Sequence, residues 1–409
     1  RVTMFKNDAL IKYGLFASYK EREYDIYRTQ VNVPTNMGIL SNGDANNILK
    51  DGNIWTPTNT GGNSIDLLFN LISRGKSYEA DQNNLASYIS FEFKLNPNFR
   101  SIIGLRGEKY FTHYTGQDGT GLREFNGEKV TDTFDLFPSS NFILSVTENS
   151  NIRFSYSKTT ARPSFKEASI AQIFDPLSNI TYIGNIDLKP TYIDNLDLRF
   201  ENFGENNQMF AVSAFYKSFK DPIELSYFES ARENFQPRNL GNATVYGAEI
   251  EARKNISDYF SINVNASIIE SKQKYGEAEN TLRTLGLRSG ETLSGSRQLQ
   301  GQSPYLINAS IDYKDDRTRA GLYFNMQGKT LEVVGNGISP DIYTYPFESL
   351  NFTFSKSFGK ESKKSINIKA ENLLNSKKES YAESYNALNR LYSYRDQGLK
   401  FSIGYSINL

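Results

Sequence analysis

Apolar and polar residues alternate one by one along much of this chain, and this pattern constrains its folding most. From Leu399 to Leu409 every second residue is apolar, and the residues between them are Lys, Ser, Gly or Asn. The same alternation recurs over 152–157, 196–201 and 260–268. Because successive side chains of a β-strand point to opposite faces, the pattern predicts strands with one apolar and one polar face.

Long apolar segments are absent from the sequence. The longest uninterrupted apolar run is Met209 to Val212, whereas a transmembrane helix needs about twenty apolar residues. Helical periodicity occurs in one short stretch, Ile65 to Ile72, where we expect a helix. If the chain crosses a membrane, it therefore crosses it with strands.

The composition disfavours several classes of function. The 46 Lys and Arg residues are balanced by 46 Asp and Glu residues, whereas nucleic-acid binding favours a basic excess. The chain has no Cys and a single His, His113, which excludes thiol chemistry and leaves no basis for a His-rich metal site or a His-based catalytic triad. We therefore expect no metal or cofactor site and no nucleic-acid partner.

Short turns and long polar connections alternate between the predicted strands. Turn sequences such as Asn96-Pro97-Asn98 and Asp315-Asp316 are typical of tight hairpins. The predicted strands cover about 9–28, 77–95, 99–115, 133–148, 151–161, 193–203, 207–218, 242–254, 259–274, 302–314, 318–329, 343–358, 364–373 and 397–409. The long connections are 30–76, 116–131, 160–192, 219–240, 275–301, 330–342 and 374–396.

These features predict an all-β fold, an antiparallel transmembrane β-barrel of about fourteen strands in a bacterial outer membrane. Its short turns would lie on the periplasmic side and its long loops outside the cell. The alternative is a large soluble β protein, such as an adhesin sandwich or a solenoid. Sandwich strands are shorter, and a solenoid would show a shorter sequence repeat. The Lys, Arg, Glu, Asn and Ser residues opposite the apolar faces would suit a wet lumen.

Several segments resemble, in the same order, motifs of TonB-dependent outer-membrane receptors of the Bacteroidota type. They are SYSKTTARPSF (155–165), GNIDLKP (184–190), VYGAEIE (245–251), ENLLN (371–375) and the closing strand at 398–409. Ile186 and Thr191 stand where the family usually has Pro and Glu, and Leu409 stands where it usually has an aromatic residue. We interpret Arg162-Pro163 as structural, since Pro ends strand pairing by removing a donor.

The resemblance implies a 22-stranded barrel with an N-terminal plug domain. Because we count fourteen strands and find nothing like a plug, we expect residues 1–409 to be the C-terminal portion of a single barrel domain. The implied partners are the plug domain of the same full-length chain, TonB with its inner-membrane motor complex, and the lipid bilayer. The implied function is active uptake of a scarce, large nutrient, whether a siderophore, vitamin, glycan or peptide. Such uptake makes and breaks no bond, so the resemblance also implies no enzymatic activity.

Two alternatives remain open from the sequence. One is a complete fourteen-stranded passive channel for hydrophobic compounds, and the other is a surface adhesin that transports nothing. A reading frame extending upstream into a plug-like domain would favour the receptor over the channel. Solubility without detergent would favour the adhesin.

Aromatic and Arg residues in the long connections are the candidates for ligand contact. Flat rings and forked guanidinium groups suit stacked rings, sugars and carboxylate-bearing chelates, and binding residues concentrate on loops. The candidates are Trp55, Tyr182, Tyr227, Phe228, Arg283, Arg288, Arg297, Tyr343 and Tyr345. For each of them, the alternative is packing of the loops against one another.

Overall fold

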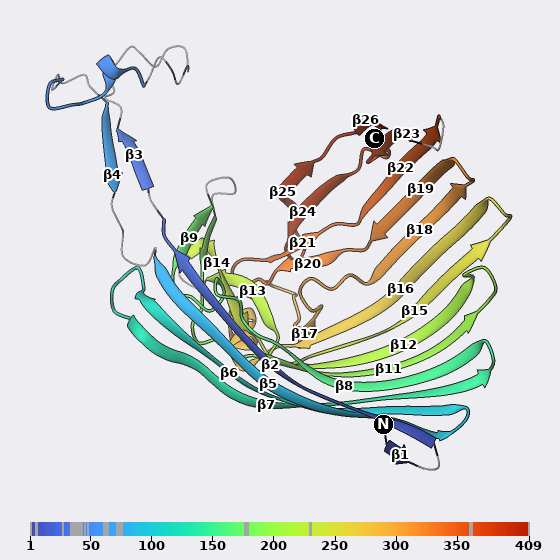
Figure 1. The fold of residues 1–409 in the computed structure, drawn as a ribbon. Coiled ribbons are helices and arrows are strands. Elements are labelled where there is room, and N and C mark those ends of the chain that lie inside the picture. Colours follow the sequence, from blue (N-terminus) through green and yellow to red (C-terminus); the bar gives the residue numbers. More distant parts are fainter. Residues whose placement is uncertain are drawn as a thin grey trace.

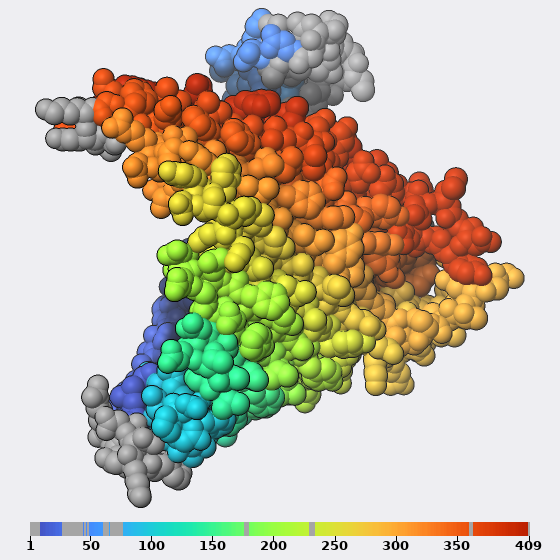
Figure 2. All heavy atoms as spheres, turned by 90° about the vertical axis from the view of Figure 1, so that its right-hand side faces the viewer, coloured from blue at the N-terminus to red at the C-terminus, as the bar shows by residue number. Residues whose placement is uncertain are grey.

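A computed structural model provides the structure of the chain. It describes residues 2–4, 7–26, 28–32, 44, 46, 49–59, 65–70, 77–175, 180–228, 231–359 and 363–407. Within these residues, the principal element is an antiparallel sheet of sixteen strands, which curves into a trough (Figure 1). Figure 2 shows that neighbouring parts of this sheet follow one another in chain order across the molecule.

The sheet runs in chain order, with each long strand between its two edges paired to the strands before and after it. Its strands are β1 (Val2–Met4), β2 (Asn7–Tyr24), β5 (Tyr78–Asn96), β6 (Phe99–Gln117), β7 (Glu124–Thr147), β8 (Ser150–Ala161), β11 (Thr191–Phe203), β12 (Met209–Lys220), β15 (Ala243–Asn255), β16 (Phe260–Lys274), β18 (Tyr305–Lys314), β19 (Thr318–Gln327), β22 (Phe347–Phe358), β23 (Lys364–Glu371) and β26 (Lys400–Ile407), with β17 (Ser296–Arg297) beside β16.

The predicted all-β fold is confirmed, and each of the fourteen predicted strands overlaps one long strand of the sheet. The connection between β6 and β7 is shorter than predicted. The segment 116–131 was expected to be a long loop, but β6 and β7 continue pairing as far as Gln117 and Glu124. Two register shifts along this pair absorb the irregular sequence, so only 118–123 connects the strands.

Strand register gathers the apolar residues on one face of the sheet. Val264 lies opposite Ala309, and Phe154 lies opposite Leu198. The next residue along β16, Asn263, lies opposite Ser310 on the other face. This polar face is the inner one, because the long connections fold over it. For β8, β11 and β16, the alternation therefore predicts correctly which face is apolar.

The prediction of helical structure was wrong in both places where it was tested. The stretch Ile65 to Ile72 was expected to be helical, but Asp66–Asn70 forms β4, which pairs with β3 (Arg28–Asn32); residues 71–72 lie outside the described part. A segment this short cannot nucleate a helix by itself, and cross-strand hydrogen bonds decide its conformation. The longest helix described, α2 (Glu277–Leu285), lies in a segment where no helix was expected. No described helix is both long and apolar enough to cross a membrane.

The two edges of the sheet lack a full set of strand partners among the described residues. At one edge, β1 covers β2 only as far as Ala9, so the rest of β2 pairs on one side only, with β5. At the other edge, β26 pairs only with β23. The described sheet is thus an open trough.

Candidate functional site

Short strands in the long connections assemble into two further sheets, which together with α2 we call the loop cap. One sheet has the order β13–β14–β10–β9, and the other has the order β20–β21–β24–β25. Their strands are β9 (Gln172–Asp175), β10 (Ile180–Ile183), β13 (Ile223–Phe228), β14 (Ala231–Asn239), β20 (Thr330–Val333), β21 (Asp341–Thr344), β24 (Lys377–Glu383) and β25 (Arg390–Asp396). In Figure 1 the cap lies at the ends of the wall strands that carry the long connections.

The two cap sheets are joined by backbone and by apolar contacts. Ser226 and Val334 form a parallel bridge, and the Val334 N–H donates to the Leu225 carbonyl at 2.9 Å. Tyr227 and Phe235 of the first sheet pack in one buried cluster with Val333 and Ile342 of the second. Seven long polar connections were expected from the sequence, and five of them contribute ordered elements to this one cap.

A buried ion network links three elements of the cap to β17 of the wall sheet. Arg297 of β17 contacts Glu224 of β13 at 2.7 Å and Glu279 of α2 at 2.8 Å, and all three side chains are at most 3% exposed. Arg283 of α2 also contacts Glu279, and it binds Asp341 of β21 at 2.8 Å. Such charges are stable in a protein interior only when they are paired and hydrogen-bonded.

Electrostatic attraction inside this network keeps both guanidinium groups charged. Burial opposes the charge on Arg297, but its hydrogen bonds to Glu224 and Glu279 outweigh burial and raise its pKa. For Arg283, burial is likewise outweighed by Asp341 and Glu279, and its pKa is raised. Both arginines therefore stay charged over the whole physiological pH range.

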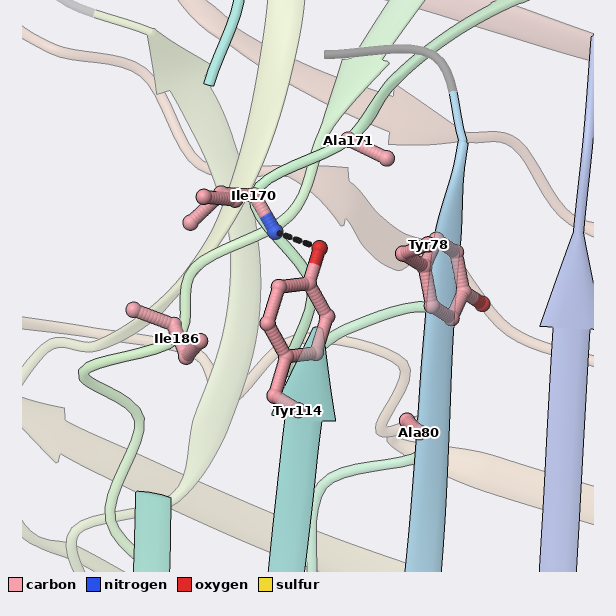
Figure 3. Close-up of a cluster of buried hydrophobic side chains, with 6 residues drawn as sticks. All are labelled: Tyr78, Ala80, Tyr114, Ile170, Ala171 and Ile186. Carbon is pink, nitrogen blue, oxygen red and sulfur yellow. Dashed lines mark hydrogen bonds between the residues drawn. The ribbon is translucent and has the colours of Figure 1, made fainter. Parts of the chain in front are cut away.

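A second buried cluster fastens the connection between β8 and β11 to the wall (Figure 3). Tyr114 of β6 points from the inner face toward this connection, and its hydroxyl accepts a hydrogen bond from the Ile170 N–H at 3.1 Å. Tyr78 of β5 stacks on Tyr114, with ring centroids 5.6 Å apart. Ile186 packs in the same cluster. The connection is thus held against the inner face rather than free above it.

Residues of two sequence motifs, SYSKTTARPSF (155–165) and GNIDLKP (184–190), contribute to this attachment. Arg162 contacts Glu108 of β6 at 2.7 Å and lies over the ring of Tyr110, 4.4 Å from its centroid. A Cβ at Gly184 would lie 2.3 Å from the Ser169 carbonyl oxygen, so the backbone approach there requires glycine. The structural interpretation of Arg162-Pro163 agrees with these contacts.

Paired charges and amides cover the inner face of the wall. Glu201 of β11 is flanked by Arg153 at 2.5 Å and Arg199 at 3.3 Å, and Arg199 reaches Glu251 of β15 at 2.9 Å. The Arg153–Glu201 pair joins the neighbouring strands β8 and β11, and the Arg199–Glu251 pair reaches across β12, so the charges also brace the wall laterally. The wall thus offers a polar surface with paired charges to whatever fills the trough.

Four of the predicted ligand residues meet inside the cap. Burial raises the pKa of Tyr227 to about 12, and its ring lies 5.0 Å from that of Phe235. Burial first, and then the charges of Asp341 and Glu383, raise the pKa of Tyr343. Together with Arg283 and Arg297, both tyrosines lie around the ion network, in positions that hold the cap together.

The other candidates are spread over the cap and beyond it. Tyr345 donates to Glu383 at 2.8 Å, and the ring of Tyr182 carries the Lys166 ammonium 4.1 Å from its centroid. Phe228 ends β13 and is half-buried. The Arg288 side chain is 45% exposed, with Glu291 3.9 Å away. Trp55, 47% exposed, lies between β3 and β4, in a hairpin separate from the cap sheets.

The sequence analysis did not identify the acidic partners of Arg283 and Arg297, which are Glu224, Glu279 and Asp341. Glu224 and Arg297 are 73 positions apart, and Arg283 and Asp341 are 58 apart. Only the spacing of Glu279 and Arg283, four residues on one helix, gives a local indication of a pair. No group of three or more His, Cys, Asp and Glu residues in the described part of the chain could hold a metal ion.

Comparison with known proteins gives a family match and several structural matches. The sequence matches the outer membrane protein beta-barrel family over residues 46–405. No curated protein matches the sequence significantly. Similar solved structures include the siderophore receptor PiuA from Acinetobacter baumannii, which is 12% identical with a TM-score of 0.62. That match covers 97% of this chain and 53% of PiuA.

Two other structures have the same fold. The ferric-catecholate import receptor Fiu from E. coli K12 is 15% identical with a TM-score of 0.54, covering 83% of this chain and 46% of Fiu. The copper transporter OprC is 13% identical with a TM-score of 0.58, covering 80% of this chain and 48% of OprC. At such identities the likeness establishes the fold alone. The chain spans about half the length of these proteins.

Proposed function

The chain belongs to the outer membrane protein beta-barrel family, and we propose that it acts as a receptor for active uptake of a scarce, large nutrient. Its predicted location in the outer membrane is confirmed by this membership. The proposal rests above all on one observation, the ordered cap of long connections over a polar inner wall. A rigid wall that carries organised loops is the arrangement in which binding residues concentrate.

The fold is consistent with uptake of more than one kind of cargo. The similar structures include two iron-chelate receptors and a copper transporter, so metal chelates are one class of ligand to test. Vitamins, glycans and peptides are the others. We propose binding and translocation without bond making or breaking, and therefore no enzymatic activity.

The proposal includes partners supplied from elsewhere. We propose that residues 1–409 are part of one barrel domain, with the first strands and a plug domain contributed by the rest of a full-length chain. The open edges at β2 and β26 support further strands, because unpaired backbone groups are not tolerated in hydrocarbon. TonB and its inner-membrane motor would then supply the energy, as the sequence motifs imply. Assignment to a Bacteroidota-type receptor remains a prediction from those motifs.

Growth of a deletion strain on limiting sources of iron, copper, vitamins, glycans and peptides tests the function. We expect one source to fail and to be rescued by the full gene, and a protonophore to abolish uptake of that source. Uptake that continues without the proton gradient would contradict TonB energisation and favour a passive channel. Normal growth on every source, with lost surface adhesion, would favour the adhesin.

A further inference from the structure

The connection 275–301, which carries α2 and β17, contacts both cap sheets, and we call it the strap. Arg297 donates to Glu224 of the first sheet at 2.7 Å, and Arg283 donates to Asp341 of the second sheet at 2.8 Å. Each arginine uses two nitrogen atoms, which bind both oxygens of its partner. Charged hydrogen bonds of this forked kind are stronger than neutral ones, so the strap is held firmly at each sheet.

A single carboxylate, that of Glu279, joins these two attachments. It accepts hydrogen bonds from Arg297 at 2.8 Å and from Arg283 at 2.9 Å, and its side chain is 3% exposed. Arg297 is bound to the first sheet and Arg283 to the second. The two sheets therefore cannot separate without breaking an ion pair on one side of Glu279 or the other.

Neutral contacts join the same two sheets. The Leu225 N–H donates to Gln300 Oε1 at 2.6 Å, and Gln300 Nε2 donates to the carbonyl oxygens of Leu225 and Glu332, so this strap residue also binds both sheets. Between the sheets, Ser226 and Val334 pair directly, and we call this pairing the seam. Their exposed fractions are 3% and 0%, so the seam is closed to solvent.

The two cap sheets are anchored on different parts of the wall. The first is built from connections between β8 and β15, and the second from connections between β19 and β26. The strap leaves the wall between them, at β16 and β18. In the described part of the chain, the sector from β2 to β7 contributes no strand to either cap sheet. The joined cap therefore spans the wall strands from β8 to β26.

We propose that the strap fuses the two cap sheets into one fixed cover, which does not open at the seam during uptake. Opening the seam would expose the apolar cluster around Tyr227 and Val333 and break the charged hydrogen bonds of Glu279, and both sets of contacts favour the joined state. A solute then passes beside the cap, over the sector from β2 to β7. The inference rests on the proposed uptake function and deepens it, because it assigns which external connections stay fixed.

Alkylation of one buried thiol tests the strap in living cells. Residues 1–409 contain no Cys, so Val334→Cys, in a full-length protein otherwise free of cysteine, places the only thiol at the seam. A bulky, membrane-impermeant maleimide reaches this thiol only when the seam opens. Cells grow in a medium that supplies iron, copper, vitamins, glycans and peptides together, with or without a protonophore. We expect slow alkylation at the same rate in both cultures.

A rate about tenfold higher in the energised cells would show that the seam opens during transport, and it would overturn the inference. Heat-modifiable gel migration checks assembly of the variant. Ser226→Cys, on the other side of the seam, replaces Val334→Cys if the latter fails to assemble.

Glu279→Gln and Glu277→Gln, each added to the thiol variant, test whether the strap is what joins the sheets. Both glutamates lie on α2, but Glu277 is exposed, whereas Glu279 is buried between the two arginines. Glu279→Gln should raise the alkylation rate about tenfold, which corresponds to about 1.4 kcal/mol, because it weakens charged hydrogen bonds. Glu277→Gln should leave the rate unchanged. Equal rates in the two variants overturn the inference.

Failure of the uptake proposal is seen separately, as normal growth of the deletion strain on every source. In that case the comparison of Glu279→Gln with Glu277→Gln still decides whether the strap joins the sheets, because it needs no transport. Conversely, a seam that opens in energised cells contradicts the fixed cover and leaves the proposed uptake standing.

Discussion

At the scale of single residues, burial decides what a charged side chain can do. Arg297 was selected from the sequence because a guanidinium on a long connection suits ligand binding. The structure encloses it between Glu224 and Glu279, where it joins β17, β13 and α2. Arg288, from the same connection, is half-exposed and has only a distant partner at 3.9 Å. The two side chains have the same chemistry, but that of Arg288 is exposed to a ligand and that of Arg297 is buried.

Replacing Arg297 by Met should destabilise the loop cap strongly. The change leaves Glu224 and Glu279 buried with too few partners, and breaking a buried pair in this way costs about 3–5 kcal/mol. Limited proteolysis of intact cells should detect faster cleavage between β16 and β18. Arg288→Met is the control and should cost less than about 1 kcal/mol, as exposed pairs do. Equal protease resistance of the two variants would contradict the assigned role of the network.

The two faces of β16 should differ sharply in their tolerance of charge. Val264 lies on the apolar face and Asn263 on the inner face, one residue apart. Val264→Arg should cost about 2–4 kcal/mol if the position is near the bilayer midplane, whereas Asn263→Arg should be mild. The measurement is the free energy of folding into lipid vesicles. Equal costs at both positions would show that the assignment of Val264 to the lipid-facing side and Asn263 to the inner side is wrong.

At the scale of elements, the sequence predicts the wall far better than the cap. A wall strand repeats its two-residue alternation many times and pairs with its neighbour in the chain, so local pattern and long-range structure agree. Cap strands are short, and some pair with distant segments: Thr181 of β10 lies opposite Asn234 of β14. Helix α2 is short, with polar residues at most positions, so its pattern alone did not reveal it. Glu224 and Asp341 were missed for the same reason, because they reach Arg297 and Arg283 from other connections.

Replacing 275–301 by a short Gly-Ser turn tests the contribution of one connection. The change removes α2 and β17, so Glu224 and Asp341 lose their arginines, while the pairing of β16 with β18 stays intact. We expect weaker ligand uptake and normal heat-modifiable migration of the barrel. Unchanged ligand affinity would exclude this connection as a ligand-binding segment. The binding residues would then be expected in 30–76, where Trp55 lies, or in the plug.

At the scale of the whole molecule, the open edges predict how the chain behaves alone. Strands β2 and β26 present unpaired backbone groups, which are costly in hydrocarbon. Expressed without other segments, the 409-residue chain should therefore misassemble or close with altered curvature. Gel filtration in detergent and heat-modifiable migration measure this, with the full-length protein as the control. A monodisperse, heat-resistant fourteen-strand barrel would contradict the expectation and favour the passive channel.

The parallel pair of β10 and β14 sets an order of events during biogenesis. A complete wall hairpin, β11 with β12, separates these two strands in the chain. The pair can form only after that hairpin has crossed the membrane and returned, and contacts between distant segments form slowly. The second cap sheet also joins separate connections, because β21 precedes the wall strands β22 and β23 and its partner β24 follows them. In a newly inserted molecule, the wall should therefore be complete for a time before the loop cap has formed over it.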